Sequence, residues 1–269
     1  MQITALGAIV ALVVAIILII KKVHPTYGLI LGAIIGGLVG GAGLTDTVAF
    51  MIEGAKGMMP AVLRILTAGV LAGVLIESGA AAKIAETIVD KLGEANSLIA
   101  LSLATMVLTM VGVFIDVAVI TVAPIALAIA KKANITKTGI LIAMIGGGKA
   151  GNMMSPNPNA IAASDAFKVP LTSVMAAGIA PAIFGFIVTC IIARKLKEKG
   201  SHVTAQEIPA DSKEKPSFIA AIVGPLTAII ILSLRPLFNI AIDPLIALPV
   251  GGIVGAVAMG KLKKINEYA

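Results

Sequence analysis

Residues 146–164, GGGKAGNMMSPNPNAIAAS, gather polar side chains in a chain that is otherwise rich in Ala, Ile, Leu, Val and Gly. Amide and hydroxyl groups can donate hydrogen bonds to a small anion, and the ammonium group of a lysine adds a positive charge. The segment is therefore the strongest candidate for a binding site. Its candidate binding residues are Lys149, Asn152, Ser155, Asn157 and Asn159.

Two prolines should interrupt any helix that runs through this segment. Pro156 and Pro158 lack a backbone N–H, and each disfavours the helical conformation of the residue before it. We therefore expect a structural break at these prolines and a new half-helix after it, with Asn159 as the N-cap. Non-helical backbone inside a membrane is tolerated only where protein or a water-filled cavity covers it. The alternative is a proline bend without a binding role, which leaves the clustered Asn and Ser side chains unexplained.

Asp116 is the acidic residue expected to lie closest to this break. It should stand at the tip of a hairpin, where its carboxylate could cap the second arm. Two half-helix N-termini that point at one volume, with Lys149 beside them, would suit a carboxylate ligand. Burial disfavours the charged form of a carboxylate, which makes Asp116 the candidate proton carrier. The alternative is a buried ion pair between Asp116 and Lys149 that only stabilises the fold.

The composition places the chain in a membrane. Hydrophobic residues make up 58% and charged residues 13% of the chain, and the mean hydropathy is +1.05; a soluble domain carries about 25% charged residues. The only histidines, His24 and His202, fall in predicted loops, and Cys190 is the only cysteine. We therefore expect no enzyme active site, no metal site and no organic cofactor. The basic residues cluster between apolar runs rather than along one face, so the expected partner is a lipid bilayer and not a nucleic acid.

The apolar runs predict an all-α polytopic transmembrane helical bundle. Residues 1–193 should form a transmembrane repeat with a re-entrant hairpin (97–130) and a broken helix (139–166), and residues 217–269 add two further transmembrane helices. The loop 194–216 is rich in Lys and Arg, which mark the cytoplasmic side of a membrane. The N-terminus is then outside, and a bacterial-type cytoplasmic (inner) membrane is expected.

Shorter features complete this topology. The hairpin's second arm, 117–130, is about 21 Å long as a helix, which is too short to span a membrane. Amphipathic stretches at 46–57 and 80–93 should lie at the two interfaces. Arg64, Glu77 and Arg235 fall near span ends and are expected to extend to the interface. Glycines spaced by four between residues 28 and 40 predict close helix packing.

The segment FIDVAVITVAPIALAIA, residues 114–130, followed by residues 146–164, resembles the hairpin and broken helix of the gluconate permease family (GntP-type). These are proton-coupled carriers of sugar acids and related hydroxy-acids within the ion transporter superfamily. The resemblance implies that Asp116 is an acidic hairpin-tip residue that carries a proton. It also implies that residues 155–159 lie on the proline-rich break that binds substrate. Family members often place histidines around the break, whereas Gly151 and Asn157 stand there in this chain, and Lys149 is an unexpected cation.

The resemblance also implies an arrangement of two inverted repeats, of which this chain resembles the N-terminal half. We therefore expect a second-half polypeptide or a homodimer as partner. The expected function is secondary transport of gluconate or a related small hydroxy-carboxylate with protons, and sodium is the alternative coupling ion. A sodium/proton antiporter whose ion site is formed by Asp116 and Lys149, and a non-transporting half-permease, are the competing hypotheses.

Overall fold

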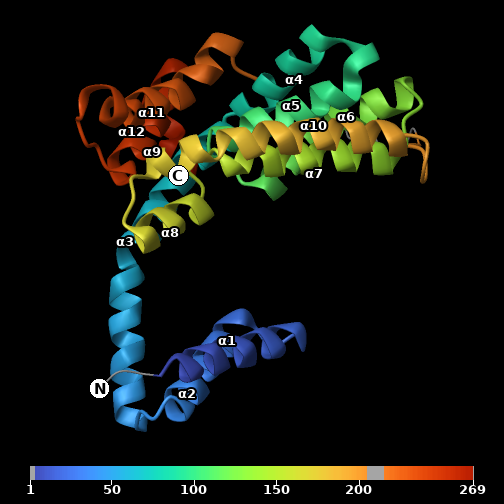
Figure 1. The fold of residues 1–269 in the computed structure, drawn as a ribbon. Helices are drawn as coiled ribbons and strands as arrows, with labels where there is room; N and C mark the ends of the chain where they lie inside the picture. The colour runs from blue at the N-terminus through green and yellow to red at the C-terminus, as the bar shows by residue number, and fades with distance from the viewer. Residues whose placement is uncertain (1–3, 205–214, 269) are drawn as a thin grey trace. The chain divides into compact units, whose positions relative to one another are not determined.

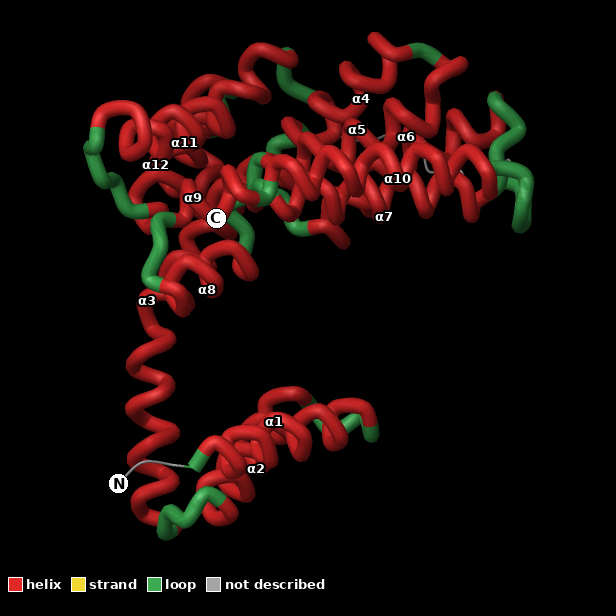
Figure 2. Tube along the Cα trace, viewed as in Figure 1, coloured by secondary structure: helices red, strands yellow, loops and turns green. Residues whose placement is uncertain are grey.

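The computed structural model describes residues 4–204 and 215–268, apart from the side chains of Glu94, Arg235 and Pro236. The expectation for Arg235 and part of the expected 194–216 loop therefore lie outside the described residues. Within them the chain forms helices joined by loops and no strand (Figure 2). The chain divides into two compact units, Met1–Pro60 and Ala61–Ala269.

Helices account for nearly all of the regular structure, as the composition predicted, and Figure 1 labels most of them. In chain order they are α1 (Ala5–Ile20), α2 (Pro25–Val39), α3 (Leu44–Glu77), α4 (Ala80–Leu92), α5 (Ser97–Met110), α6 (Ile115–Lys132), α7 (Lys137–Met153), α8 (Pro158–Phe167), α9 (Leu171–Ala177), α10 (Ile179–Leu196), α11 (Phe218–Phe238), α12 (Pro244–Ala258) and the short α13 (Ile265–Tyr268).

In the first unit, α1 and α2 pack tightly through the glycines of α2. A Cβ atom at Gly32 would lie 2.5 Å from the carbonyl oxygen of Ala11, and one at Gly36 would lie 2.5 Å from that of Gly7. Any side chain at these two positions would force the helices apart. The close packing expected from the glycine spacing is therefore confirmed.

Helix α3 differs from the prediction of an interfacial segment followed by a separate span. It is one helix of 34 residues that continues through Pro60. A proline inside a helix removes one hydrogen bond, and membrane helices tolerate that loss. Met59 and Ala61, on either side of it, are good helix formers. The helix therefore continues across the boundary that we expected near residue 57.

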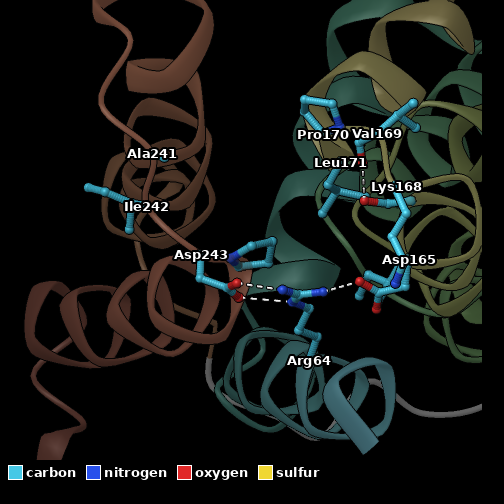
Figure 3. Close-up of a pocket in the computed structure, with 12 residues that line it drawn as sticks. Arg64, Asp165, Lys168, Val169, Pro170, Leu171, Ala241, Ile242 and Asp243 are labelled. Carbon is cyan, nitrogen blue, oxygen red and sulfur yellow. Dashed lines mark hydrogen bonds and ion pairs between the residues drawn. The ribbon is translucent and has the colours of Figure 1, made fainter. Parts of the chain in front are cut away.

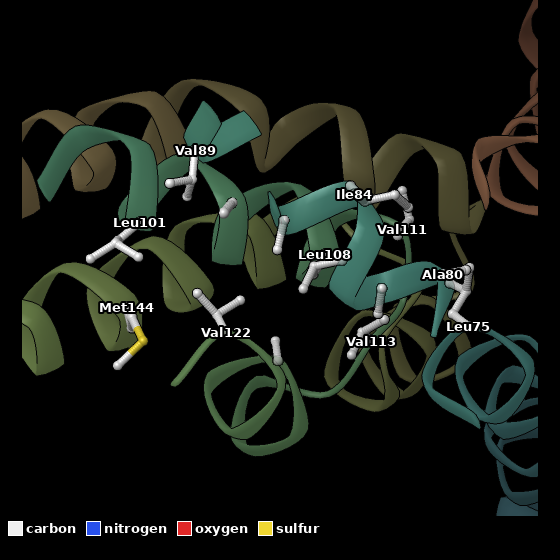
Figure 4. Packing of buried hydrophobic residues seen from close by; sticks show 14 of the residues in the cluster. Leu75, Ala80, Ile84, Val89, Leu101, Leu108, Val111, Val113, Val122 and Met144 are labelled. Carbon is white, nitrogen blue, oxygen red and sulfur yellow. The ribbon is translucent and has the colours of Figure 1, made fainter. Parts of the chain in front are cut away.

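In the second unit, α7 lies against α5, α6 and α10 (Figure 1). Large apolar side chains from most helices of this unit are buried in one cluster, shown in part in Figure 4. They include Leu75 of α3, Leu101 and Leu108 of α5, Val122 of α6 and Met144 of α7. This cluster positions the hairpin and the broken helix relative to each other.

Helix α4 covers α5 with one face. Its buried residues are Ala80, Ala81, Ile84, Ala85 and Val89, which recur at the spacing of one helix face. The amphipathic character expected for 80–93 is therefore confirmed.

The two arms of the hairpin are α5 and α6, joined at residues 111–114. Gly112 in this turn has φ of +105°, a conformation that favours glycine. Helix α6 has 18 residues, or about 27 Å, and includes Lys131 and Lys132, whose charges suit a helix C-terminus. Helix α5 has 14 residues, or about 21 Å. The short arm is therefore the first one, not the second as predicted.

The exposed surface fits a membrane protein. The stretches Leu44–Glu77 and Leu171–Leu196 are long and apolar enough to cross a bilayer, and shorter apolar helices accompany them. Large apolar side chains are exposed along helices of both units, such as Leu12 and Ile20 in α1 and Ile183 and Phe184 in α10. Such rows of exposed apolar side chains mark contact with lipid or protein. The chain is an all-α polytopic membrane protein.

Candidate functional site

The predicted break lies between Met153, the last residue of α7, and Pro158, the first residue of α8. Asn157 is the N-cap of α8: its Oδ1 accepts hydrogen bonds from the backbone N–H groups of Asn159 at 2.7 Å and Ala160 at 3.2 Å. The prediction of Asn159 as the cap is therefore wrong. Because these N–H groups are occupied and Pro158 has none, the start of α8 lacks the free donors that we expected for an anion.

Asn157 and Ser155 also hold the non-helical backbone of the break. The Nδ2 group of Asn157 donates to the carbonyl oxygen of Asn152 and, at 2.9 Å, to Oγ of Ser155. Ser155 Oγ donates in turn to the Asn152 carbonyl oxygen at 3.2 Å. Ser155 is 0% and Asn157 4% exposed. These two side chains position the break, whereas Asn159 is exposed beside it.

The glycines before the break allow α7 to touch α5. A Cβ atom at Gly147 would overlap the carbonyl oxygen of Ser102, and one at Gly151 would overlap that of Met106. Neither neighbour is a side chain that could turn away. Because Gly147 and Gly151 have no side chains, the broken helix can pack directly against the backbone of the hairpin's first arm.

Two further glycines face two further helices. A Cβ atom at Gly146 would overlap the side chain of Thr189 on α10, and one at Gly148 would lie 3.3 Å from Ile115 on α6. Together with the α5 contacts, these neighbours surround α7 on three sides.

The remaining side of α7 is open. Leu141, Ile145 and Met153 are 45, 46 and 48% exposed, and Lys149 is exposed between them. The four residues recur every four positions, so they form one stripe on the helix. Exposing the charged Lys149 to lipid would be costly. Protein or a water-filled cavity is therefore the favoured neighbour of this side of α7. We call this stripe the open face of α7.

The hairpin tip meets the break. A Cβ atom at Gly112 would lie 3.8 Å from Cγ of Pro156. Asp116 lies in the first turn of α6 but does not cap it, because the N-cap is Phe114, which makes no side-chain hydrogen bond. The prediction of Asp116 as a cap is therefore wrong.

Asp116 and Lys149 are both exposed, and the contact of Ile115 with Gly148 brings their helices together. No ion pair joins the two in the described part of the chain. The alternative of a buried, purely structural pair is therefore wrong. The structure leaves one carboxylate and one ammonium group on exposed surfaces of adjoining helices.

A second polar region surrounds Arg64, which we expected to extend to the interface. Its Nε and Nη2 donate to Oδ1 and Oδ2 of Asp243 at 3.0 and 2.6 Å, and its Nη1 donates to Asp165. Figure 3 shows the guanidinium group between the two carboxylates. A cavity of about 320 Å³ lies beside them, lined also by Ile161 and Lys168.

The sequence interpretation missed Asp165 and Asp243. Asp165 comes one residue after the apolar run that ends at Ser164, and Asp243 precedes Pro244 as an N-cap residue does. A search for carboxylates to compensate an arginine inside a span would have selected both.

Comparison with known proteins identifies the family. The sequence profile of the GntP family permeases matches residues 2–251. The chain belongs to the GntP permease family. No solved structure matches it.

Relatives in this family are permeases and transporters. The chain is 63% identical over 268 residues to an uncharacterized transporter from Haemophilus influenzae, which covers 99% of this chain and 64% of that protein. It is 34% identical over 142 residues to the inner membrane permease YgbN from Escherichia coli, covering 51% and 31% of the two chains. It is 29% identical over 214 residues to a gluconate permease from Bacillus licheniformis, covering 78% and 46%. The chain thus spans less than two thirds of the length of these GntP relatives.

Proposed function

We propose that this chain forms part of a secondary transporter that carries gluconate, or a related small hydroxy-carboxylate, together with protons. The observation that carries the proposal is the meeting of the hairpin tip with the helix break, with Asp116 and Lys149 exposed on adjoining helices. Secondary transporters commonly bind their substrates at discontinuous helices near the middle of the membrane. The likeness to a gluconate permease supports the choice of a sugar acid.

Lys149 is the group that attracts the anion. Since Asn157 occupies the donors at the start of α8, the positive charge at this site comes mainly from the Lys149 ammonium group. The exposed amide of Asn159 can donate a hydrogen bond to a substrate hydroxyl or carboxylate. Asn152, which is partly exposed, completes the polar lining.

Asp116 is the proton carrier in this proposal. Its carboxylate is exposed and has no ion-pair partner within the described residues, so the burial that we expected of a proton carrier has to come from the part of the transporter that covers this surface. A free carboxylate could bind sodium equally well, which keeps the sodium/proton antiporter as the second candidate. Counterflow of labelled gluconate separates the two, because an antiporter without an organic substrate gives none.

The rest of the transporter should cover the open face of α7. The cover is either the polypeptide that the longer relatives possess or a second copy of this chain. If no cover exists, Lys149 faces lipid and the chain does not transport alone.

The contacts inside the second unit support spans of alternating direction, and the richness of the 194–216 loop in Lys and Arg is our reason for assigning its side to the cytoplasm of a bacterial-type cell. With alternating spans and a hairpin at 97–130, the span ends near residues 78, 136, 199 and 261 fall on one side of the membrane. These ends meet one another: Thr136 Oγ1 donates to the Lys199 carbonyl oxygen at 2.9 Å, and Lys261 Nζ donates to that of Ser78 at 2.8 Å. Arg64, Asp165 and Asp243, which fall on the opposite side in this topology, also meet. This arrangement is what spans of alternating direction produce.

We expect an impermeant maleimide added to intact cells to label a cysteine introduced by Ala241→Cys but not one introduced by His202→Cys. The native Cys190 is buried and gives a low background. Labelling of His202→Cys from outside, with Ala241→Cys protected, would reverse the orientation.

Replacing Lys149 by Ala should raise the half-saturation concentration for gluconate uptake about tenfold or more, because a charge-assisted hydrogen bond contributes about 1.5–3 kcal/mol. Initial uptake rates over a range of gluconate concentrations give this value. Lys131→Ala, which removes another exposed lysine from the end of α6, is the matched control and should leave it unchanged. An unaltered half-saturation concentration in Lys149→Ala would exclude this role.

A further inference from the structure

The two ion pairs of Arg64 are unequal. Asp243 accepts two hydrogen bonds from the guanidinium group, and its Oδ1 also accepts one from the backbone N–H of Leu245 at 2.9 Å, at the start of α12. Asp165 accepts from Arg64 through Oδ1 alone, and its Oδ2 is buried with no hydrogen-bond partner among the described residues. The link to Asp165 is therefore the weaker of the two, since one carboxylate oxygen stays unsatisfied.

Helix α8, which carries Asp165, has few other anchors. Ala160 and Ile161 are its buried residues. The helical hydrogen bonds of α7 do not continue into it, because the break at residues 154–157 intervenes. At its far end, the Ser164 hydroxyl bonds only locally, to the carbonyl oxygen of Val169 at 2.7 Å. Asp165 is therefore the polar connection between the last turn of α8 and the helices α3 and α12 (Figure 3).

We propose that the Arg64–Asp165 pair is a releasable latch that holds α8 in place, with Asp243 keeping Arg64 oriented. When the latch opens, Arg64 retains Asp243, so its charge is not left uncompensated, which would be costly in a partly buried site. Asp165 can turn its carboxylate into the adjoining cavity of about 320 Å³. Helix α8 is then free to move about the break.

The inference rests on the proposed function in one respect: α8 begins at the break where the substrate is proposed to bind. Movement of α8 would carry Asn159 and the cap residue Asn157 with it. The latch would thus control when the proposed site can change shape. Arg64 and Asp165 are positioning residues in this mechanism and do not touch the substrate.

A thiol on the buried side of α8 tests the latch in the intact protein. Ile161 is 1% exposed and lines the cavity beside Arg64, so a thiol introduced by Ile161→Cys reacts with a maleimide only when α8 moves. Adding Asp165→Asn should speed this labelling about fivefold, the effect of losing a partly exposed ion pair worth about 1 kcal/mol. The native Cys190, which is buried in α10, should keep its slow rate and reports the overall fold.

Two matched variants complete the experiment. Asp165→Glu keeps the carboxylate and should restore most of the slow labelling, and Lys168→Gln removes an exposed charge from the same end of α8 and should have no effect. Labelling of Asp165→Asn at the parent rate would overturn the latch. Equal acceleration at Cys190 would also overturn it, because the pair would then hold the whole fold. The labelling needs neither gluconate nor an ion gradient, so failure of the proposed transport function would show separately.

Discussion

Cells that carry Asp116→Asn should lose pH-driven accumulation of gluconate altogether while they retain some exchange of labelled for unlabelled gluconate. An amide cannot bind and release a proton near neutral pH, so the gradient has no carrier. Exchange needs only that the loaded site reorients, which the neutral amide allows. Asp116 suits this role because it lies at the start of α6, directly after the hairpin turn that meets the break, with no ion-pair partner in the described chain.

Asp46→Asn is the matched control for this prediction. Asp46 is also an exposed aspartate in the first turn of a helix, α3, and its replacement should leave accumulation intact. Uptake of labelled gluconate with and without an imposed pH gradient measures both variants. Undiminished accumulation in Asp116→Asn would assign the proton to another group, and accumulation that follows a sodium gradient instead would favour the alternative coupling ion.

The second large effect is expected from Gly151→Val. A Cβ atom at residue 151 would overlap the carbonyl oxygen of Met106 and the hydroxyl of Thr109. Overpacking in a core typically costs about 1–3 kcal/mol and occasionally more, and here a backbone oxygen would have to move. We expect α7 to separate from α5 and little folded protein to remain.

The same substitution at Gly185 of α10 gives the control. No atom lies within 4 Å of the position that a Cβ would occupy there, so Gly185→Val should leave stability nearly unchanged. The buried Cys190 allows thermal unfolding to be followed with a thiol-reactive fluorophore in detergent. A normal unfolding temperature for Gly151→Val would show that α7 does not touch the backbone of α5 at residue 151.

The sequence was most informative where one residue type dictates local backbone. The prolines at 156 and 158 predicted the break, because a missing N–H and a restricted preceding residue act on the chain itself. The cap was misassigned for a local reason as well: proline favours the first position of a helix, which makes Asn157, before Pro158, the natural N-cap.

Contacts between distant segments could not be predicted in this way. The sequence offers Asp165 and Asp243 as candidate partners for Arg64, but it does not indicate that both would surround its guanidinium group. Similarly, the sequence does not show that each glycine at 146–151 faces a particular neighbour on α5, α6 or α10. Such contacts depend on which helices pack together and at which positions. The spacing of apolar residues in the sequence predicts helices but not their packing partners.

The central claim is that substrate binds where the hairpin tip meets the helix break, beside the open face of α7. Substrate protection tests it most directly: a cysteine introduced by Asn159→Cys, exposed beside the break, is labelled with a maleimide in membranes with and without gluconate. We predict that saturating gluconate slows this labelling several-fold, that neutral glucose does not, and that neither affects a cysteine introduced by Lys131→Cys at the far end of α6. Labelling of Asn159→Cys at the same rate with and without gluconate, in a variant that still takes up gluconate, would contradict the claim.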